Sequence, residues 1–200
     1  MTHPTAVPSH QGLAFEAARI ICREALVDYR AAKLKAAQRL GGSLRTAALP
    51  DNLSIRDAVV EYQRLFGGAR YRERLAAMRH AALQAMRLLA SYDPRLVGAL
   101  PSGAVTDSHR VQLQAFAETA EMVDIFLEDR GIRCRQGDRD YRFAGGDTRI
   151  IPLTQFEVGN IGVDVATFDP DRRAHPPLSP VTGKAERGLD LTAVEALGDR

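Results

Sequence analysis

The strongest constraint in this 200-residue sequence is a change of hydrophobic period near Pro94. Before that residue, apolar side chains recur every three or four positions, as they do along one face of an amphipathic helix. After it, apolar and polar residues alternate, a pattern typical of strands with two different faces. The sequence therefore predicts an α+β fold, in which an N-terminal helical region precedes a small mixed β-sheet with one flanking helix.

The pattern before Pro94 predicts three helices. Residues 13–40 contain no proline and keep a helical period up to the "GGS" at 41–43. Ser54 and Asp57 form a capping-box pattern, which places the start of the second helix there, and a Gly-Gly pair ends that helix. The third helix is expected over 69–91. All three are amphipathic, so they are expected to pack on one another.

The apolar stripe of the first predicted helix is long for a chain of this size. Its members recur at helical spacing: Ala17, Ile20, Ile21, Val27 and Leu34. Such a stripe exceeds what a small second domain can cover, so helices from two copies of the chain are expected to pack together as a homodimer.

The alternating pattern after Pro94 predicts a run of strands. Two are expected over 95–100 and 110–116. The segment 132–143 is expected to form a hairpin that turns at its Gly-Asp pair. The segment 148–158 carries one proline, which favours an edge strand or a bulge. The last strand, over 160–168, follows a hairpin signal at Gly159-Asn160.

One helix is expected between these strands, over 119–130. Its apolar residues Met122, Ile125 and Phe126 are predicted to face inward. Gly131 is well placed as a left-handed cap.

Three regions follow from this reading: a helical N-terminal region over 1–92, an α/β domain over 93–168, and an extended proline-rich tail over 169–200. The tail is expected to end in a short helix capped by Asp190.

The charge and the apolar segments bear on partners and location. The formal charge of +2 gives no strong sign of nucleic-acid binding, and no segment approaches the length of a membrane span. The first residues lack the pattern of a signal peptide, so a cytoplasmic protein is expected.

A resemblance to a known family rests on three short motifs. Gly98-Ala99 would be the turn at the end of the first strand, Arg110 and Gln112 lie two positions apart on the next, and Asp164 lies on a later strand. In this arrangement residues 95–168 resemble the nucleotidyltransferase superfamily of the DNA polymerase β type. "GALPSGAVT" at 98–106 and "PLSPVTG" at 177–183 also resemble a bacterial group of that superfamily with a helical N-terminal region.

The resemblance implies roles for six residues. Gly98, Ala99, Ser102, Arg110 and Gln112 would bind the ligand, which would be a nucleotide or another phosphorylated small molecule, and Asp164 would be the catalytic third acid. In the family, acids at the positions of Arg110 and Gln112 join that third acid to hold two magnesium ions. Acids two residues apart point to the same face of a strand, so both reach one metal pair.

The departures at these two positions change the expected chemistry. Arginine and glutamine do not make a magnesium site, because magnesium prefers carboxylates and water. We therefore expect a degenerate member that uses no metal cofactor, with Arg110 and Asp164 forming a salt bridge. One alternative is an active nucleotidyltransferase with magnesium and nucleotide, which would use Asp107 and His109 in a shifted register. Another is a helical dimerisation or regulatory protein.

Overall fold

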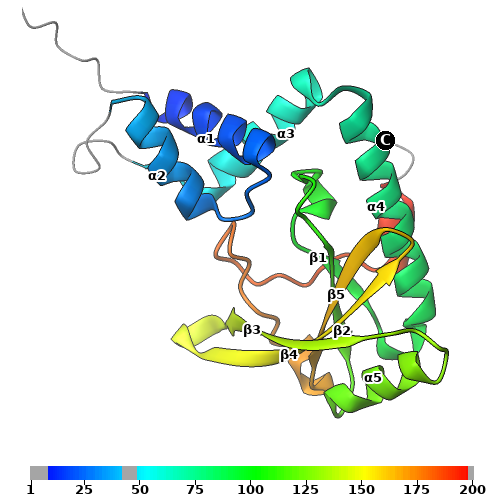
Figure 1. Cartoon of the computed structure of the whole chain (residues 1–200). Coiled ribbons are helices and arrows are strands. Elements are labelled where there is room, and N and C mark those ends of the chain that lie inside the picture. Colours follow the sequence, from blue (N-terminus) through cyan, green and yellow to red (C-terminus); the bar gives the residue numbers. More distant parts are fainter. Residues whose placement is uncertain (1–8, 42–48, 198–200) are drawn as a thin grey trace, which may run out of the picture. The chain divides into compact units, whose positions relative to one another are not determined.

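A computed structural model describes residues 9–41 and 49–197 of the chain (Figure 1). The fold is α+β, with helices first and a five-stranded mixed sheet after them. The helices are α1 (His10–Glu24), α2 (Tyr29–Arg39), α3 (Asn52–Phe66), α4 (Gly68–Leu88), α5 (Ala120–Glu128) and α6 (Leu191–Glu195). The strands are β1 (Arg95–Val97), β2 (Val111–Phe116), β3 (Arg135–Arg142), β4 (Thr148–Val158) and β5 (Ile161–Phe168).

The chain forms two compact units, and the division falls within α4. The first unit holds the residues up to Arg72 together with Ser102–His109, and the second holds Glu73–Pro101 together with the chain from Arg110 onward. Short 3-10 turns complete the elements: η1 (Ala90–Tyr92), η2 (Leu100–Ser102), η3 (Ala144–Gly146) and η4 (Pro170–Arg173).

The first unit contains two helices where the sequence predicted one over 13–40. The break lies at Ala25, which has a left-handed backbone with φ of 51°. Asp28 then caps α2, because its carboxylate accepts a hydrogen bond from the Arg30 N–H at 2.7 Å. The chain thus stops and restarts without a glycine or a proline. Of the "GGS" at 41–43, Gly42 and Ser43 lie outside the described residues.

The apolar stripe of α1 is covered within the first unit. Leu13, Ala17, Ile20 and Ile21 are at most 1% exposed, and they belong to one core cluster with residues of α2 and α3. No second copy of the chain is needed to cover these residues, and Val27 of the predicted stripe lies between α1 and α2 and is 56% exposed. The homodimer itself stays a prediction.

The second predicted helix, α3, has a different start from the one predicted. α3 begins at Asn52 after Asp51, whose carboxylate accepts from the Ser54 N–H at 2.7 Å, so the capping box at Ser54 and Asp57 is wrong. An acid three residues before a helical N–H is well placed to satisfy it, and Asp51 does so. Gly67 ends the helix, as predicted.

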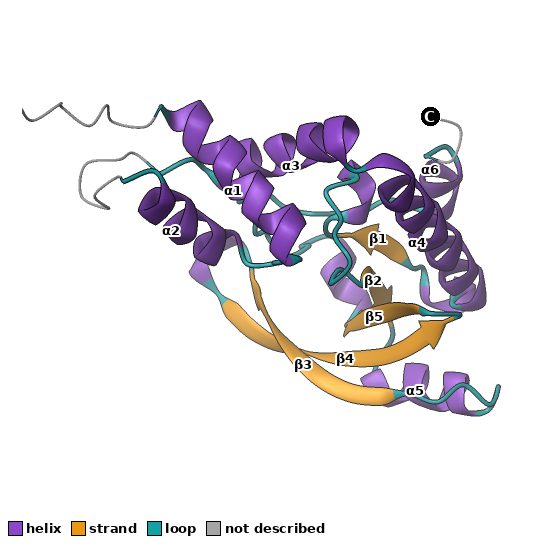
Figure 2. Cartoon of the chain, turned by 45° about the horizontal axis from the view of Figure 1, so that its top comes forward, coloured by secondary structure: helices purple, strands orange, loops and turns teal. Residues whose placement is uncertain are grey.

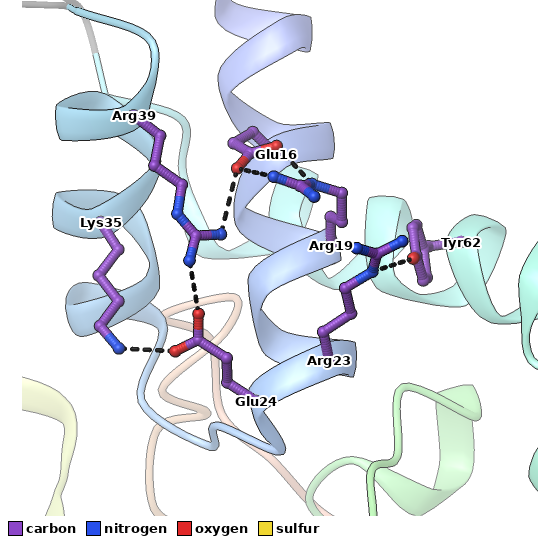
Figure 3. A network of polar contacts seen from close by, with 7 residues as sticks. All are labelled: Glu16, Arg19, Arg23, Glu24, Lys35, Arg39 and Tyr62. Atoms are coloured by element: carbon purple, nitrogen blue, oxygen red, sulfur yellow. Dashed lines mark hydrogen bonds and ion pairs between the residues drawn. The ribbon is translucent and has the colours of Figure 1, made fainter.

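Charged side chains connect α1 to α2 in the first unit (Figure 3). The Glu24 carboxylate contacts Lys35 at 2.6 Å and Arg39 at 2.8 Å. Arg39 also reaches Glu16 at 3.5 Å, and Glu16 pairs with Arg19 at 2.7 Å. The hydrogen bond from Arg19 lowers the pKa of Glu16 most, while burial acts in the opposite direction. Two carboxylates and three cations thus form one network across the helix pair.

This network predicts a loss of stability in acid. The folded pKa of Glu16 lies below the ordinary value of 4.5, so its pairs stabilise the fold above that pH and are lost as the pH falls through the folded pKa. We expect Glu16→Gln to lower the free energy of unfolding at pH 7 by about 0.5–1 kcal/mol. Its pH dependence below 4.5 should also become flatter. Urea denaturation followed by circular dichroism from neutral to acid pH measures both.

Glu61→Gln is the matched control for this prediction. Glu61 is exposed on α3, and no ion pair is found for it in the described residues. Its curve should follow the wild type. Parallel curves for Glu16→Gln and the wild type through the acid range would contradict the prediction.

The sheet of the second unit has the strand order β1-β2-β5-β4-β3. β2 runs parallel to β5, while every other neighbouring pair is antiparallel. The strands expected over 95–100, 110–116 and 160–168 are therefore neighbours, as predicted. The first of them is shorter than predicted, because Gly98 has φ of 80° and turns the chain after Val97.

The segment predicted as a hairpin at Gly137 and Asp138 is instead one continuous strand, β3. It pairs with β4 without interruption from Arg135↔Gln155 to Arg142↔Thr148. Gly137 lacks the positive φ that would mark a tight turn. The long partner strand favours extended pairing over a local turn, and the two strands form a curved ribbon (Figure 2).

Pro152 lies within β4, an interior strand of the sheet. It pairs with Asp138 of β3, but pairing with β5 begins only at Leu153↔Ala166. One side of β4 is thus unpaired at Pro152, where a missing N–H breaks no ladder. The predicted edge character holds at this position and not for the whole strand. The hairpin at Gly159 joins β4 to β5, as predicted.

Helix α5 packs on the sheet with a face other than the one predicted. Met122 and Ile125 are 44% and 56% exposed, while Val123, Asp124 and Leu127 are buried. Hydrogen bonds of Asp124 turn this face toward the sheet. Its carboxylate accepts from Thr154 Oγ1 of β4 at 2.6 Å and from Gln136 Nε2 of β3 at 2.9 Å. Gly131 caps the helix with φ of 73°, and the Ile132 N–H reaches the Leu127 carbonyl, as predicted.

The tail runs from one edge of the sheet to the other. The Leu178 N–H donates to the Arg142 carbonyl of β3 at 2.7 Å, and Leu189 forms a two-bond bridge with Leu96 of β1. β3 and β1 are the two edge strands, and the tail contacts β3 at its last residue and pairs with β1 at Leu96. Asp190 caps α6, as predicted, by accepting from the Ala193 N–H at 2.8 Å.

Candidate functional site

The register of the sheet brings three of the predicted site positions together. Gln112 of β2 and Asp164 of β5 are directly paired, and Arg110 lies one residue before β2. Directly paired residues of neighbouring strands share a face, so Gln112 and Asp164 lie side by side on the same face. Arg110 reaches that face as well, since its Nε contacts Asp164 Oδ1 at 2.6 Å. This confirms the predicted salt bridge.

The carboxylate of Asp164 is enclosed by donors from three directions. Its side chain is 5% exposed. Oδ1 accepts from Arg110 Nε and from Gln155 Nε2 at 3.0 Å, and Oδ2 accepts from Arg139 Nη2 at 2.8 Å. A buried carboxylate needs such partners to remain charged. Both oxygens are therefore engaged, and neither is open to a metal ion in this arrangement.

Arg139 and Gln155 were not found from the sequence. Gln155 is the direct partner of Asp164 across β4 and β5, so it is visible only once that register is known. Arg139 comes from β3, in the segment that the sequence assigned to a hairpin. A continuous strand there, alternating "RQGDRDYR", was the signal that would have revealed it.

Arg110 crosses over β5 at Gly162. Its Nη2 donates to the Phe156 and Val163 carbonyls, both at 3.3 Å. A Cβ atom at Gly162 would overlap the guanidinium of Arg110. The absence of a side chain at Gly162 is therefore what lets Arg110 reach Asp164.

Replacing Gly162 tests this crossing. Gly162→Ala should displace Arg110 from Asp164 and lower the free energy of unfolding by about 1–3 kcal/mol, because a buried carboxylate loses one partner. Denaturant titration measures the change, and Gly137→Ala is the control. A Cβ at Gly137 would make only an ordinary contact with Gln155, at 3.8 Å. Equal stabilities for the two variants would contradict the crossing.

The predicted turn at Gly98 is close to both Gln112 and the tail. A Cβ at Gly98 would lie 2.6 Å from Gln112 Oε1, so that side chain would have to shift, and the φ of 80° favours glycine. The backbone of Gly98 also hydrogen-bonds the Glu186 carboxylate, whose pKa is raised mainly by burial and lowered in part by this bond. A carboxyl group of the tail thus hydrogen-bonds the backbone of Gly98, a residue to which the resemblance gave a ligand-binding role.

The remaining predicted residues lie around this turn and beyond it. Ala99 follows Gly98 directly before η2. Ser102 belongs to the first unit, where its Oγ accepts from the Ala104 N–H at 3.4 Å. The structure therefore groups Gly98, Arg110, Gln112 and Asp164 in one unit and places Ser102 in the other.

Asp107 and His109 would replace the two acids in the alternative register. Both residues belong to the first unit. Asp107 forms an ion pair with Arg70. His109 Nδ1 accepts from the Thr106 N–H at 3.0 Å and lies 2.8 Å from Thr106 Oγ1. Each residue is thus engaged within its own loop and helix.

Within residues 9–41 and 49–197, no three His, Cys, Asp or Glu side chains are grouped closely enough to bind a metal ion. None of the helices there combines the length and the apolar composition needed to cross a bilayer.

Comparison with known proteins gave no significant match to a family model, to a curated protein or to a solved structure.

Proposed function

We propose that this chain is a nucleotidyltransferase-like protein that has lost the acid pair for two metals and binds a nucleotide or another phosphorylated small molecule without metal chemistry. The observation that carries the proposal is the pairing of Gln112 with Asp164, with the Arg110 guanidinium 2.6 Å from that carboxylate. Acids at positions 110 and 112 would meet Asp164 on one sheet face. Arginine and glutamine stand there instead.

Electrostatics supports the loss of metal chemistry. Two guanidinium groups, from Arg110 and Arg139, face the single carboxylate of Asp164. A divalent cation at this position would meet two fixed positive charges at close range, in a region where water screens poorly. The two arginines therefore neutralise the charge of Asp164, as metal ions neutralise the acids of a two-metal site.

Calorimetry with nucleotides tests the proposal on the unchanged protein. We expect ATP, CTP, GTP or UTP, or a simpler phosphorylated compound, to bind with an affinity that changes little when magnesium is added. The reason is that phosphate would be held by arginine and by backbone or amide donors. Binding that requires magnesium would contradict the proposal and would favour the active enzyme with Asp107 as a ligand.

A restored acid pair tests the same idea in the opposite direction. Arg110→Asp combined with Gln112→Asp should create magnesium affinity at least about tenfold above that of the wild type, because three carboxylates then lie on neighbouring strands. Calorimetry with magnesium chloride measures the gain. The matched control is Arg110→Asn with Gln112→Asn, which has the same side-chain shapes without the charges. Equal affinities in the two double variants would contradict the assignment of these positions.

A further inference from the structure

A second cluster of arginines surrounds a cavity of about 340 Å³ in the second unit. The strands contribute Arg95, Gln114 and Phe116 to its wall, and the tail contributes Arg173, Pro176 and Arg187. Arg95 and Gln114 are directly paired across β1 and β2, so they present one face of the sheet to the cavity. We call this cavity the arginine pocket. Its volume is in the range of sites for small molecules.

The arginine pocket carries an excess of positive charge. Three guanidinium groups line it, against the lining carboxylate of Asp93, and Asp190 contacts Arg95 at 3.6 Å without lining the pocket. Asp93 contacts Arg95 at 2.9 Å and Arg173 at 3.2 Å, so it orients both. Arg187 is exposed, and no ion pair is found for it in the described part of the chain. One arginine is therefore available to an anion while two are held in place beside it.

Gln114 provides an independent sign of a ligand. It is 1% exposed, and its Nε2 has no hydrogen-bond partner among the described residues. A buried amide without a partner is costly, and it is common where a bound molecule supplies the missing group. The two ends of the amide have the same shape, so a half-turn of the group presents either donor or acceptor to the pocket.

The apolar part of the wall restricts the ligand further. Phe116 is 8% exposed, and the Arg173 guanidinium lies 5.1 Å from its ring centroid, which stacks that arginine over the ring. Pro176 adds a second apolar surface. The pocket thus offers fixed guanidinium groups at one side and limited apolar contact at the other, which suits a compact anion with a short carbon body.

We propose that the arginine pocket binds a small phosphate monoester through its dianionic phosphate. Planar guanidinium groups bind phosphate oxygens in pairs, and the three lining guanidinium groups outnumber the carboxylates of Asp93 and Asp190 that contact them, which favours an anionic ligand. The pocket contains none of the residues assigned to the site around Gly98 and Arg110. This inference therefore goes beyond the proposed function and does not depend on the family resemblance.

Calorimetry and thermal unfolding with inorganic phosphate and ribose 5-phosphate test the pocket, with ribose as the uncharged control. We expect both phosphates to bind and to raise the unfolding temperature, while ribose does neither. Arg187→Gln should weaken binding of ribose 5-phosphate at least about tenfold, since it removes a charged hydrogen bond. Lys184→Gln removes an exposed charge of the same tail outside the pocket and should weaken binding less than about twofold.

A second variant, Gln114→Met, separates ligand binding from folding. It keeps the volume and removes the unpartnered amide, so the unfolding temperature of the ligand-free protein should stay equal or rise while binding weakens. Lower stability with unchanged binding would mean that the amide is structural and would overturn its role.

Three other results would overturn the pocket. One is the absence of binding by either phosphate in the wild type, and another is equal weakening in Arg187→Gln and Lys184→Gln. The third is loss of binding in Gln112→Ala with retention in Arg187→Gln. That result would place the ligand beside Gly98 and Arg110, so the proposed function would stand while the arginine pocket would not.

Discussion

The carboxylate of Asp164 is the interaction on which the sheet of the second unit depends. It lies on β5 and accepts hydrogen bonds from Gln155 on β4, from Arg139 on β3 and from Arg110 just before β2. One buried charge thus fixes the mutual positions of four strands. Removing a single partner would leave the charge partly uncompensated, which is costly in the interior. Gly162 is part of the same arrangement, because its missing side chain gives Arg110 its path over β5.

The tail is the second element that shapes this face of the sheet. It reaches the edge strand β3 through Leu178 and the edge strand β1 through Leu189. Between these points it places Glu186 at the N–H of Gly98. A sheet face that carries glutamines and arginines would otherwise be hydrated, and the tail converts part of it into an enclosed polar layer. Polar groups in such a layer are either paired, as at Asp164, or left for a ligand, as at Gln114.

Features with a local cause were predictable from the sequence. The change of period near Pro94 indicated the fold class and the strands, and the family resemblance implied that Arg110, Gln112 and Asp164 would meet on neighbouring ones. The helix stop at Gly131 and the cap at Asp190 also follow from single residues and their neighbours.

The features that were missed depend on partners far along the chain. The inward face of α5 is set by Asp124 with Thr154, thirty residues away, and Arg139 finds Asp164 only because β3 pairs with β4 along its whole length. The break between α1 and α2 at Ala25 was missed for another reason. Alanine rarely adopts a left-handed backbone, so the residue type gave no sign of the break. Period and spacing cannot identify such long-range pairs, and this is why only one of the three hydrogen-bond donors to Asp164, Arg110, was predicted.

The two arginine clusters of the second unit differ in what they leave open. Arg110 and Arg139 direct their guanidinium groups to Asp164, and Arg110 also donates to two backbone carbonyls. Their capacity to bind an outside anion is thereby reduced, because an incoming phosphate would have to compete with a buried carboxylate at 2.6–2.8 Å. In the arginine pocket, Asp93 divides its two oxygens between Arg95 and Arg173 and leaves Arg187 without a carboxylate. The first cluster thus already holds a carboxylate of the chain itself, whereas the second keeps one arginine without a carboxylate partner among the described residues.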